Sequence, residues 1–299
     1  MNKLVAVGLP QTGKTTFLAA LWHVTESEEI KGSLRLEKIS DEAKHLNEIR
    51  NEWLSFQQVG RTVLGQEQSV SLWLKNEQGA VGEVAFPDLS GEAFEQAWTG
   101  RHWPTEYDEH IANARGLLLF VHPDTVKEPI SIREMQQMVE AAIPEEAEAD
   151  AYEAILRDSD RTVEPTEEWN PLMAPTQVQL VELLQFVHQR SKSEFPIRLG
   201  IVISAWDIVK NKHGDQYSGS AGAEAWLTDR LPYLVQFMRS NPEFINVRIY
   251  GVSAQGGDLS ADRQALQRFE RTAERILIEG PDCARHDISE PIRWCLGLR

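Results

Sequence analysis

The chain carries at residues 8–15 the stretch Gly8-Leu9-Pro10-Gln11-Thr12-Gly13-Lys14-Thr15. This stretch fits G-x-x-x-x-G-K-[ST], the pattern of a phosphate-binding loop. Residues 4–7 before it form an apolar run that predicts a buried parallel strand, and residues 16–22 after it predict the opening of a helix. Because strand, glycine loop and helix is the context that the motif needs, we favour nucleoside triphosphate binding over a chance match in an ordinary strand-turn-helix. The loop alone does not choose between ATP and GTP.

The residue types in this loop suit phosphate chemistry. Gly8 and Gly13 let the backbone turn tightly, so that successive N–H groups can surround a phosphate at a helix N-terminus. We expect the Lys14 ammonium on the β- and γ-phosphates and the Thr15 hydroxyl on Mg²⁺. The other residues here that we expect to contact the nucleotide are Pro10, Gln11, Thr12 and Thr16.

Length and composition bound the class of protein. With 299 residues the chain can form one enlarged α/β domain or two small ones, and we expect one domain over residues 1–299. The net charge of −16 argues against a nucleic acid as the main partner. The longest apolar run, residues 116–121, is too short to cross a bilayer. No secretory signal fits the first residues, and Cys283 and Cys295 are expected to be core thiols, so we expect a cytoplasmic protein.

Strand-like and helix-like patterns alternate along the chain, which predicts an α/β fold with a mostly parallel sheet flanked by helices. In such a fold, ligand-binding loops lie at the carboxyl ends of the strands. The expected strands are 33–39, 68–75, 80–86, 116–121, 198–203 and 246–252. The expected helices are 41–58, 176–189, 223–239, with a break at Pro232, and 263–278.

Two segments add to this alternation. Residues 123–175 hold 14 acidic and 4 basic residues, so they carry −10 of the net charge and predict an acidic, partly helical insertion. The insertion supplies no motif, and we expect it to be a partner surface or a lid. Residues 258–299 are expected to form a C-terminal helical segment packed on the domain.

A second phosphate-site motif follows the strand predicted over residues 80–86. Asp88 and Gly91 give the pattern D-x-x-G at the end of that strand. An acidic residue there can reach Mg²⁺ in a phosphate-loop fold, whereas the simpler interpretation is a strand-to-helix loop with a capping aspartate. The phosphate loop on the same chain favours the metal-site interpretation.

The order of the motifs at the strand ends resembles the translation-factor and Ras-like class of GTPases. The stretch Ser204-Ala205-Trp206-Asp207 stands where that class has N/T-K-x-D, and Ser253-Ala254 matches its S-A motif. The resemblance implies a Ras-like G domain with helical insertions. It also implies that Asp207 accepts hydrogen bonds from guanine and that Ser253 and Ala254 contact the base through backbone N–H groups. Ala205 replaces the usual lysine, and Trp206 could either stack on the base in compensation or pack in the core.

A narrower resemblance is to the bacterial double-GTPase family. The residues that carry it are Gly8 to Trp22, Pro87 to Glu92, and Ile288 to Trp294. This resemblance implies GTP or GDP as the nucleotide, Mg²⁺ as cofactor, and a regulatory switch in a bacterial multi-protein system. The implied protein partner is a second GTPase or an activating protein.

Two residues are expected to govern hydrolysis. Glu92 follows the D-x-x-G glycine, where Ras-like enzymes have a glutamine that orients water. A carboxylate there can still orient water, but its charge repels a γ-phosphate, so we expect slow GTP hydrolysis without a partner. Thr62, in a glycine-flanked loop, is the expected switch threonine on Mg²⁺, and Thr25 is the alternative.

Two other classes of function stay open at this stage. One is a phosphate-loop ATPase or small-molecule kinase, against which Asp207 and the Ser253-Ala254 pair argue. The other is a nucleotide-binding scaffold that hydrolyses little, which the carboxylate of Glu92 keeps open.

Overall fold

The computed structural model describes residues 2–40, 43–59, 69–87, 91–101, 105–130, 133, 136–137 and 170–298. These residues form an eight-stranded sheet in the order β2-β3-β4-β1-β5-β6-β7-β8. The strands are β1 Asn2–Val7, β2 Arg35–Ile39, β3 Val70–Lys75, β4 Val81–Phe86, β5 Gly116–Val121, β6 Ile197–Ser204, β7 Ile245–Ser253 and β8 Leu277–Glu279. The predicted mostly parallel α/β sheet is confirmed.

Parallel pairing runs through the centre of the sheet and antiparallel pairing lies at its edges. The pairs β4–β1, β1–β5, β5–β6 and β6–β7 are parallel. The pairs β2–β3 and β3–β4 at one edge and β7–β8 at the other are antiparallel. All six residues of β5 are buried, as the apolar run 116–121 predicts for a central strand. The carboxyl ends of the five parallel strands therefore meet at one edge of the sheet.

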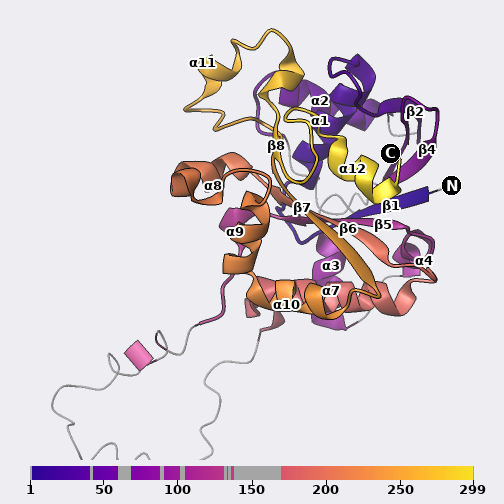
Figure 1. The fold of residues 1–299 in the computed structure, drawn as a ribbon, viewed down its shortest axis with the longest axis vertical. Helices are drawn as coiled ribbons and strands as arrows, with labels where there is room; N and C mark the ends of the chain where they lie inside the picture. The colour runs from indigo at the N-terminus through magenta and orange to yellow at the C-terminus, as the bar shows by residue number, and fades with distance from the viewer. Residues whose placement is uncertain are drawn as a thin grey trace, which may run out of the picture.

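Helices cover both faces of this sheet (Figure 1). They are α1 Lys14–Ser27, α2 Ala43–Leu54, α3 Glu92–Gly100, α4 Asp108–Ala112, α7 Thr176–Arg190, α8 Trp206–His213, α9 Gly222–Arg230, α10 Pro232–Ser240, α11 Arg263–Leu266 and α12 Glu290–Leu296. Helices α1, α2 and α12 pack on one face, and α3, α4 and α7 to α10 on the other. Side chains in β1 alternate between these two cores: Leu4 and Ala6 enter the first, Val5 and Val7 the second.

The helix predicted over residues 263–278 is wrong. Only Arg263–Leu266 is α-helical, a 3₁₀ turn covers Thr272–Arg275, and Leu277–Glu279 forms β8 against β7. The backbone comes close to another loop here, because a Cβ on Gly256 would lie 2.2 Å from the Arg275 carbonyl oxygen. Pairing with β7 and this close approach outweigh the helical spacing of the apolar residues. The segment predicted as helical over 258–299 thus also contains a strand. The break at Pro232, in contrast, is confirmed, since α9 ends and α10 begins around it.

Helix α12 packs on three glycines of the sheet, which we call the glycine strip. A Cβ on Gly82 of β4 would lie 2.7 Å from Leu296, and one on Gly116 of β5 would lie 2.7 Å from the Cys295 carbonyl oxygen. A Cβ on Gly200 of β6 would lie 2.8 Å from the Cys295 sulfur. The three glycines therefore let α12 approach the strands closely. Both cysteines are free thiols, and Cys295 is fully buried in this contact.

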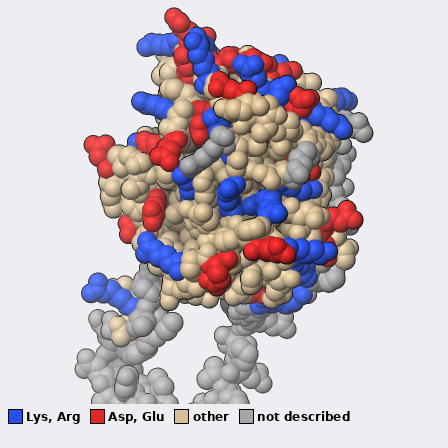
Figure 2. All heavy atoms as spheres, turned by 45° about the vertical axis from the view of Figure 1, so that its right-hand side comes forward, with Lys and Arg blue, Asp and Glu red and all other residues tan. Residues whose placement is uncertain are grey.

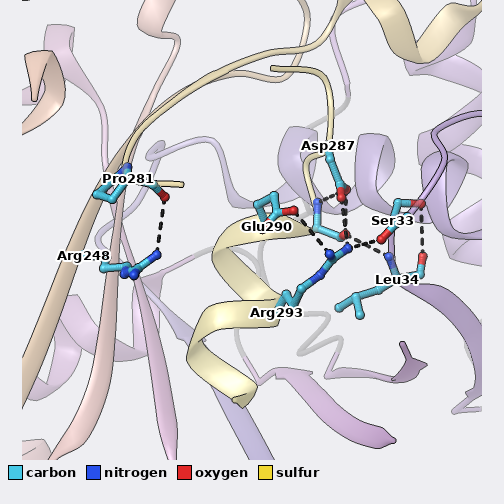
Figure 3. A network of polar contacts seen from close by, with 9 residues as sticks. Ser33, Leu34, Arg248, Pro281, Asp287, Glu290 and Arg293 are labelled. Atoms are coloured by element: carbon cyan, nitrogen blue, oxygen red, sulfur yellow. Dashed lines mark hydrogen bonds and ion pairs between the residues drawn. The ribbon is translucent and has the colours of Figure 1, made fainter. Parts of the chain in front are cut away.

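A polar junction fixes the start of α12 to the segment between α1 and β2 (Figure 3). The Ser289 hydroxyl donates to the Asp287 carboxylate at 2.6 Å and accepts from the Leu34 N–H at 3.0 Å. Arg293 pairs with Asp287 at 3.1 Å and also donates to the Gly32 carbonyl oxygen. Burial raises the pKa of the Asp287 carboxyl, which the hydrogen bonds from Ser289 and the charge of Arg293 oppose. The stretch Ile288 to Trp294 is thus a structural junction.

The surface of the described part carries both signs of charge. Figure 2 shows one face, on which acidic and basic side chains are interspersed. Since residues 123–175 hold −10 of the net charge of −16, the acidic excess belongs mainly to the insertion. Most of the insertion, which the sequence predicts to be partly helical, lies outside the described residues. No helix among the described residues is long and apolar enough to cross a membrane.

Candidate nucleotide-binding site

The phosphate loop connects β1 to α1, as the sequence predicts. Gly13 adopts a left-handed conformation, with φ of 85°, directly before the first residue of α1. A Cβ on Gly13 would lie 3.0 Å from the Ser204 side chain, and one on Gly8 would lie 3.0 Å from the Phe120 carbonyl oxygen. The loop is therefore pressed between the ends of β5 and β6, where only glycine fits without displacement.

Lys14 is the charged residue of this loop and is only 2% exposed. Its ammonium donates to the carbonyl oxygens of Gly8 at 2.8 Å and Leu9 at 2.9 Å. The Thr12 hydroxyl also donates to the Leu9 carbonyl oxygen, at 2.8 Å. These bonds curve the loop around the lysine head, which places the charge where a bound phosphate would meet it.

The remaining loop residues differ in exposure. Thr15 and Thr16 stand in the first turn of α1 and are half-buried. Pro10 is half-buried and Gln11 is exposed, with a left-handed φ of 63°. The loop thus has a glycine-dependent shape, a buried cation and a hydroxyl next to it, a donor set that fits a triphosphate and Mg²⁺.

Gly91 of the D-x-x-G pattern lies against the phosphate loop. Its φ is 84°, and a Cβ there would lie 2.6 Å from the Leu9 carbonyl carbon and 2.7 Å from the Gly8 carbonyl oxygen. Glu92, the next residue, begins α3. The structure therefore brings Gly91 and the loop together, while Asp88 lies outside the described residues.

The residues predicted to recognise the base come from two adjacent loops. Ala205 is left-handed, with φ of 47°, and turns the chain from β6 into α8. Asp207 is therefore in the first turn of α8, where its carboxylate accepts a hydrogen bond from the Ser253 hydroxyl. Ser253 also accepts from the Gly256 N–H at 3.2 Å. The two strand-end motifs are thus directly bonded to each other.

The sequence left two interpretations of Trp206, stacking on the base and packing in the core, and its side chain packs in the core. Its side chain is 1% exposed, and a Cβ on Gly251 of β7 would lie 2.3 Å from its ring. The indole N–H donates to Glu279 of β8 at 2.9 Å, and Lys210 pairs with the same carboxylate. The left-handed turn at Ala205 directs the ring onto the sheet, so the core-packing interpretation is the one observed.

A cavity of about 370 Å³ joins the two motif groups. This volume is within the range of small-molecule sites. The predicted residues that line it are Gly13, Thr16, Ala205, Asp207, Ser253 and Ala254. Trp206 is not among the described residues that line it.

Sequence reasoning missed several residues of this cavity. They include His122, Lys212, Gln58, Val59 and Gln255. Burial lowers the pKa of His122, against the charges of Asp124 and Asp207, and its Nδ1 accepts from the Asp124 N–H at 3.2 Å. The position of His122 directly after β5 was a usable signal, because ligand loops follow parallel strands. Nothing in the sequence pattern indicated Lys212.

Thr62 and Thr25 are the two candidates for the switch threonine, and only Thr25 is among the described residues. Thr25 lies within α1 and is 2% exposed, and its hydroxyl donates to the Leu21 carbonyl oxygen at 2.9 Å. The Thr25 hydroxyl is thus bonded within its own helix, which gives no support to the alternative. Thr62 lies outside the described residues.

The fold and the site together define a phosphate-loop nucleotide-binding protein whose motifs follow the Ras-like order. The profile of the family described as Double-GTPase 1 matches residues 5–295. The chain therefore belongs to the Double-GTPase 1 family, and it is a GTP-binding switch protein.

Solved structures of GTPases resemble the chain only distantly. The mammalian SRP receptor is 14% identical, with 89% of this chain and 98% of that chain covered and a TM-score of 0.37. The SRP receptor complex from Chaetomium thermophilum is 12% identical, with 85% and 91% covered and a TM-score of 0.36. The Arl6 small GTPase from Trypanosoma brucei is 11% identical, with 89% and 95% covered and a TM-score of 0.34. No curated protein matches the sequence.

Proposed function

We propose that the chain binds GTP and GDP with Mg²⁺ in the 370 Å³ cavity and at the phosphate loop beside it, and that it hydrolyses GTP slowly. The observation that carries this proposal is the shared cavity of Gly13 and Asp207, with Asp207 held by the Ser253 hydroxyl. A phosphate cradle and a carboxylate suited to guanine thus face the same space.

Phosphate binding falls to the loop. Lys14 would exchange its bonds to the Gly8 and Leu9 carbonyl oxygens for the β- and γ-phosphates, and the loop N–H groups would donate to the same oxygens. Thr15 would hold Mg²⁺, together with Asp88 and Thr62 of the chain. The metal, when bound, neutralises charge that develops on the phosphates.

Base recognition falls to Asp207 and the Ser253-Ala254 loop. The carboxylate accepts two hydrogen bonds from guanine, and adenine offers no donor pair of that shape. Leaving the base-facing acceptor positions of this half-buried carboxylate without donors costs about 2–4 kcal/mol, which corresponds to a preference for GTP over ATP of at least tens-of-fold.

We assign GTP hydrolysis to Glu92 of α3 and the control of its rate to a partner protein. Glu92 at the start of α3 would orient the attacking water, and its negative charge opposes the γ-phosphate. Slow intrinsic turnover suits a switch whose lifetime a second protein sets. We place this partner, a second GTPase or an activating protein, with the chain in a bacterial cytoplasmic multi-protein system.

A competition experiment tests the base preference. GTP, ATP and XTP compete against fluorescent GDP on the unmodified protein and on Asp207→Asn. We expect GTP to compete tens-of-fold better than ATP on the unmodified protein. Asp207→Asn should shift the preference toward XTP, because xanthine has a carbonyl where guanine has its amino group.

The control is Asp229→Asn, which makes the same chemical change at an exposed carboxylate on α9 that accepts from the Tyr217 hydroxyl at 2.9 Å. It should leave all three affinities unchanged. Equal competition by ATP and GTP on the unmodified protein would contradict the proposal and favour an ATPase.

A further inference from the structure

The loop that carries Ser253 and Ala254 is held from two sides. On the α8 side, the Ser253 hydroxyl bonds to Asp207. On the α2 side, the Trp53 indole N–H donates to the Ala254 carbonyl oxygen at 3.0 Å. Trp53 is 0% exposed and comes from a helix 201 positions earlier in the chain. The second bond therefore ties the proposed base-recognition loop to an element that carries none of the nucleotide motifs.

Arg275 fixes the indole in this position. Its guanidinium carbon lies 3.7 Å from the centre of the Trp53 ring and 4.5 Å from that of Phe56. The same guanidinium donates to the Trp53 carbonyl oxygen at 2.5 Å. Arg275 is 1% exposed, and burial lowers its pKa to about 10. A stacked and hydrogen-bonded guanidinium of this kind leaves the tryptophan little rotational freedom.

The backbone of Arg275 also contacts the loop that carries Ser253 and Ala254. A Cβ on Gly256 would lie 2.2 Å from the Arg275 carbonyl oxygen, so Gly256 and Arg275 are in backbone contact. Ala254 and Gly256 are thus both supported by the Trp53–Arg275 pair. Because Ala254 stands between the two bonded residues Ser253 and Gly256, its peptide plane is set by these contacts.

We propose that Trp53, held by Arg275, is a positioning residue for guanine recognition. By bonding the Ala254 carbonyl oxygen, it orients the Ala254 peptide so that the loop's N–H groups face the base while Asp207 faces the base edge. This inference rests on the proposed function, since it concerns the same cavity. It predicts that loss of the indole N–H weakens binding of the base and leaves binding of the phosphates intact.

The test separates these two parts of the nucleotide. Affinities for GDP and for tripolyphosphate, each with Mg²⁺, are measured by calorimetry on the unmodified protein, Trp53→Phe and Trp22→Phe. Trp22 is the matched control, because it is a buried indole in the neighbouring helix α1 whose N–H donates to Asn47 at 3.2 Å instead of to the loop. Trp53→Phe should bind GDP about tenfold more weakly and tripolyphosphate within about twofold of the unmodified protein. Trp22→Phe should change neither affinity.

A second variant keeps the inference testable if Trp53→Phe does not fold. Arg275→Lys retains a charge but cannot stack a planar group between Trp53 and Phe56. It should weaken GDP binding several-fold and spare tripolyphosphate. Equal GDP affinities for Trp53→Phe and Trp22→Phe, or an unchanged GDP affinity for Arg275→Lys, would overturn the inference. An equal loss of affinity for GDP and for tripolyphosphate would also overturn the inference, because it would indicate general damage to the site. If the unmodified protein binds tripolyphosphate but not GDP, the proposed function itself fails.

Discussion

Lys14 combines a charge with almost complete burial, and its ammonium donates to the carbonyl oxygens of Gly8 and Leu9. Hydrogen bonds from an ammonium to charged phosphate oxygens are stronger than those to neutral carbonyl oxygens. The residue is therefore better suited to holding phosphates than to stabilising the fold.

At this scale we predict the effect of Lys14→Ala. GTP affinity should fall about 100-fold, because a charge-assisted contact to two phosphates is lost. The melting temperature should change by less than about 5 °C, since the side chain contributes little apolar packing. Titration with fluorescent GDP and thermal unfolding check both values. Lys38→Ala, which removes a cation of β2 that lies over the Trp73 ring of β3, should leave the affinity unchanged. A folded Lys14→Ala protein with normal affinity would contradict the phosphate-loop assignment.

Sequence predicts some residues of the site well and others not at all. The positions of the phosphate loop, Asp207 and Ser253 were predictable, because short motifs encode backbone turns at strand ends. The direction of the Trp206 side chain was not, since it follows from the left-handed turn at Ala205 and the glycine at position 251. Trp53 was likewise unpredictable, because its partner lies far away in the chain.

At the scale of elements, central strands were the most predictable part of the fold. The run at residues 116–121 is apolar on both faces, which only a central parallel strand requires. The apolar residues within 263–278 have helical spacing. The structure of this segment is nevertheless determined by the pairing of β8 with β7, a contact between distant segments. Local pattern therefore failed where non-local pairing determined the structure.

The junction at the start of α12 yields a prediction for stability. Asp287→Ala should lower the free energy of unfolding by about 2–3 kcal/mol, because Arg293 and Ser289 lose a buried partner. Chemical denaturation measures this change. Nucleotide affinity of the folded protein should stay within about twofold, since Gly82 and Gly116 under α12 lie near the strand ends remote from the cavity.

The control for this prediction is Glu37→Ala, which removes an exposed carboxylate paired with Lys75 at 2.5 Å. An exposed pair contributes at most about 1 kcal/mol, so this variant should be nearly as stable as the unmodified protein. Equal effects of the two substitutions would show that the junction does not hold α12.

For the whole molecule, the acidic insertion yields the clearest prediction. Its two stems are tied together, because the Lys127 N–H donates to the Thr176 hydroxyl at 2.8 Å and the Lys127 ammonium donates to the Leu172 carbonyl oxygen at 2.7 Å. The chain thus leaves and re-enters the described part at neighbouring points. Deletion of residues 145–168 should therefore leave GDP affinity within a few-fold, as measured by titration. A collapse of folding or of binding would show that the insertion is integral to the domain.

The glycine strip under α12 also bears on how the chain is made. Helix α12 follows all eight strands of the described sheet in the chain, so on a ribosome the strip on β4, β5 and β6 stays bare until residues 290–296 have emerged. At ordinary rates of translation, the interval between Gly200 and α12 lasts on the order of ten seconds. Throughout that time a nascent chain exposes an apolar sheet face that a chaperone can bind. The sheet is therefore covered late in synthesis, and a ribosome stalled between residues 279 and 290 holds all eight strands of the described sheet without the helix that packs on the glycine strip.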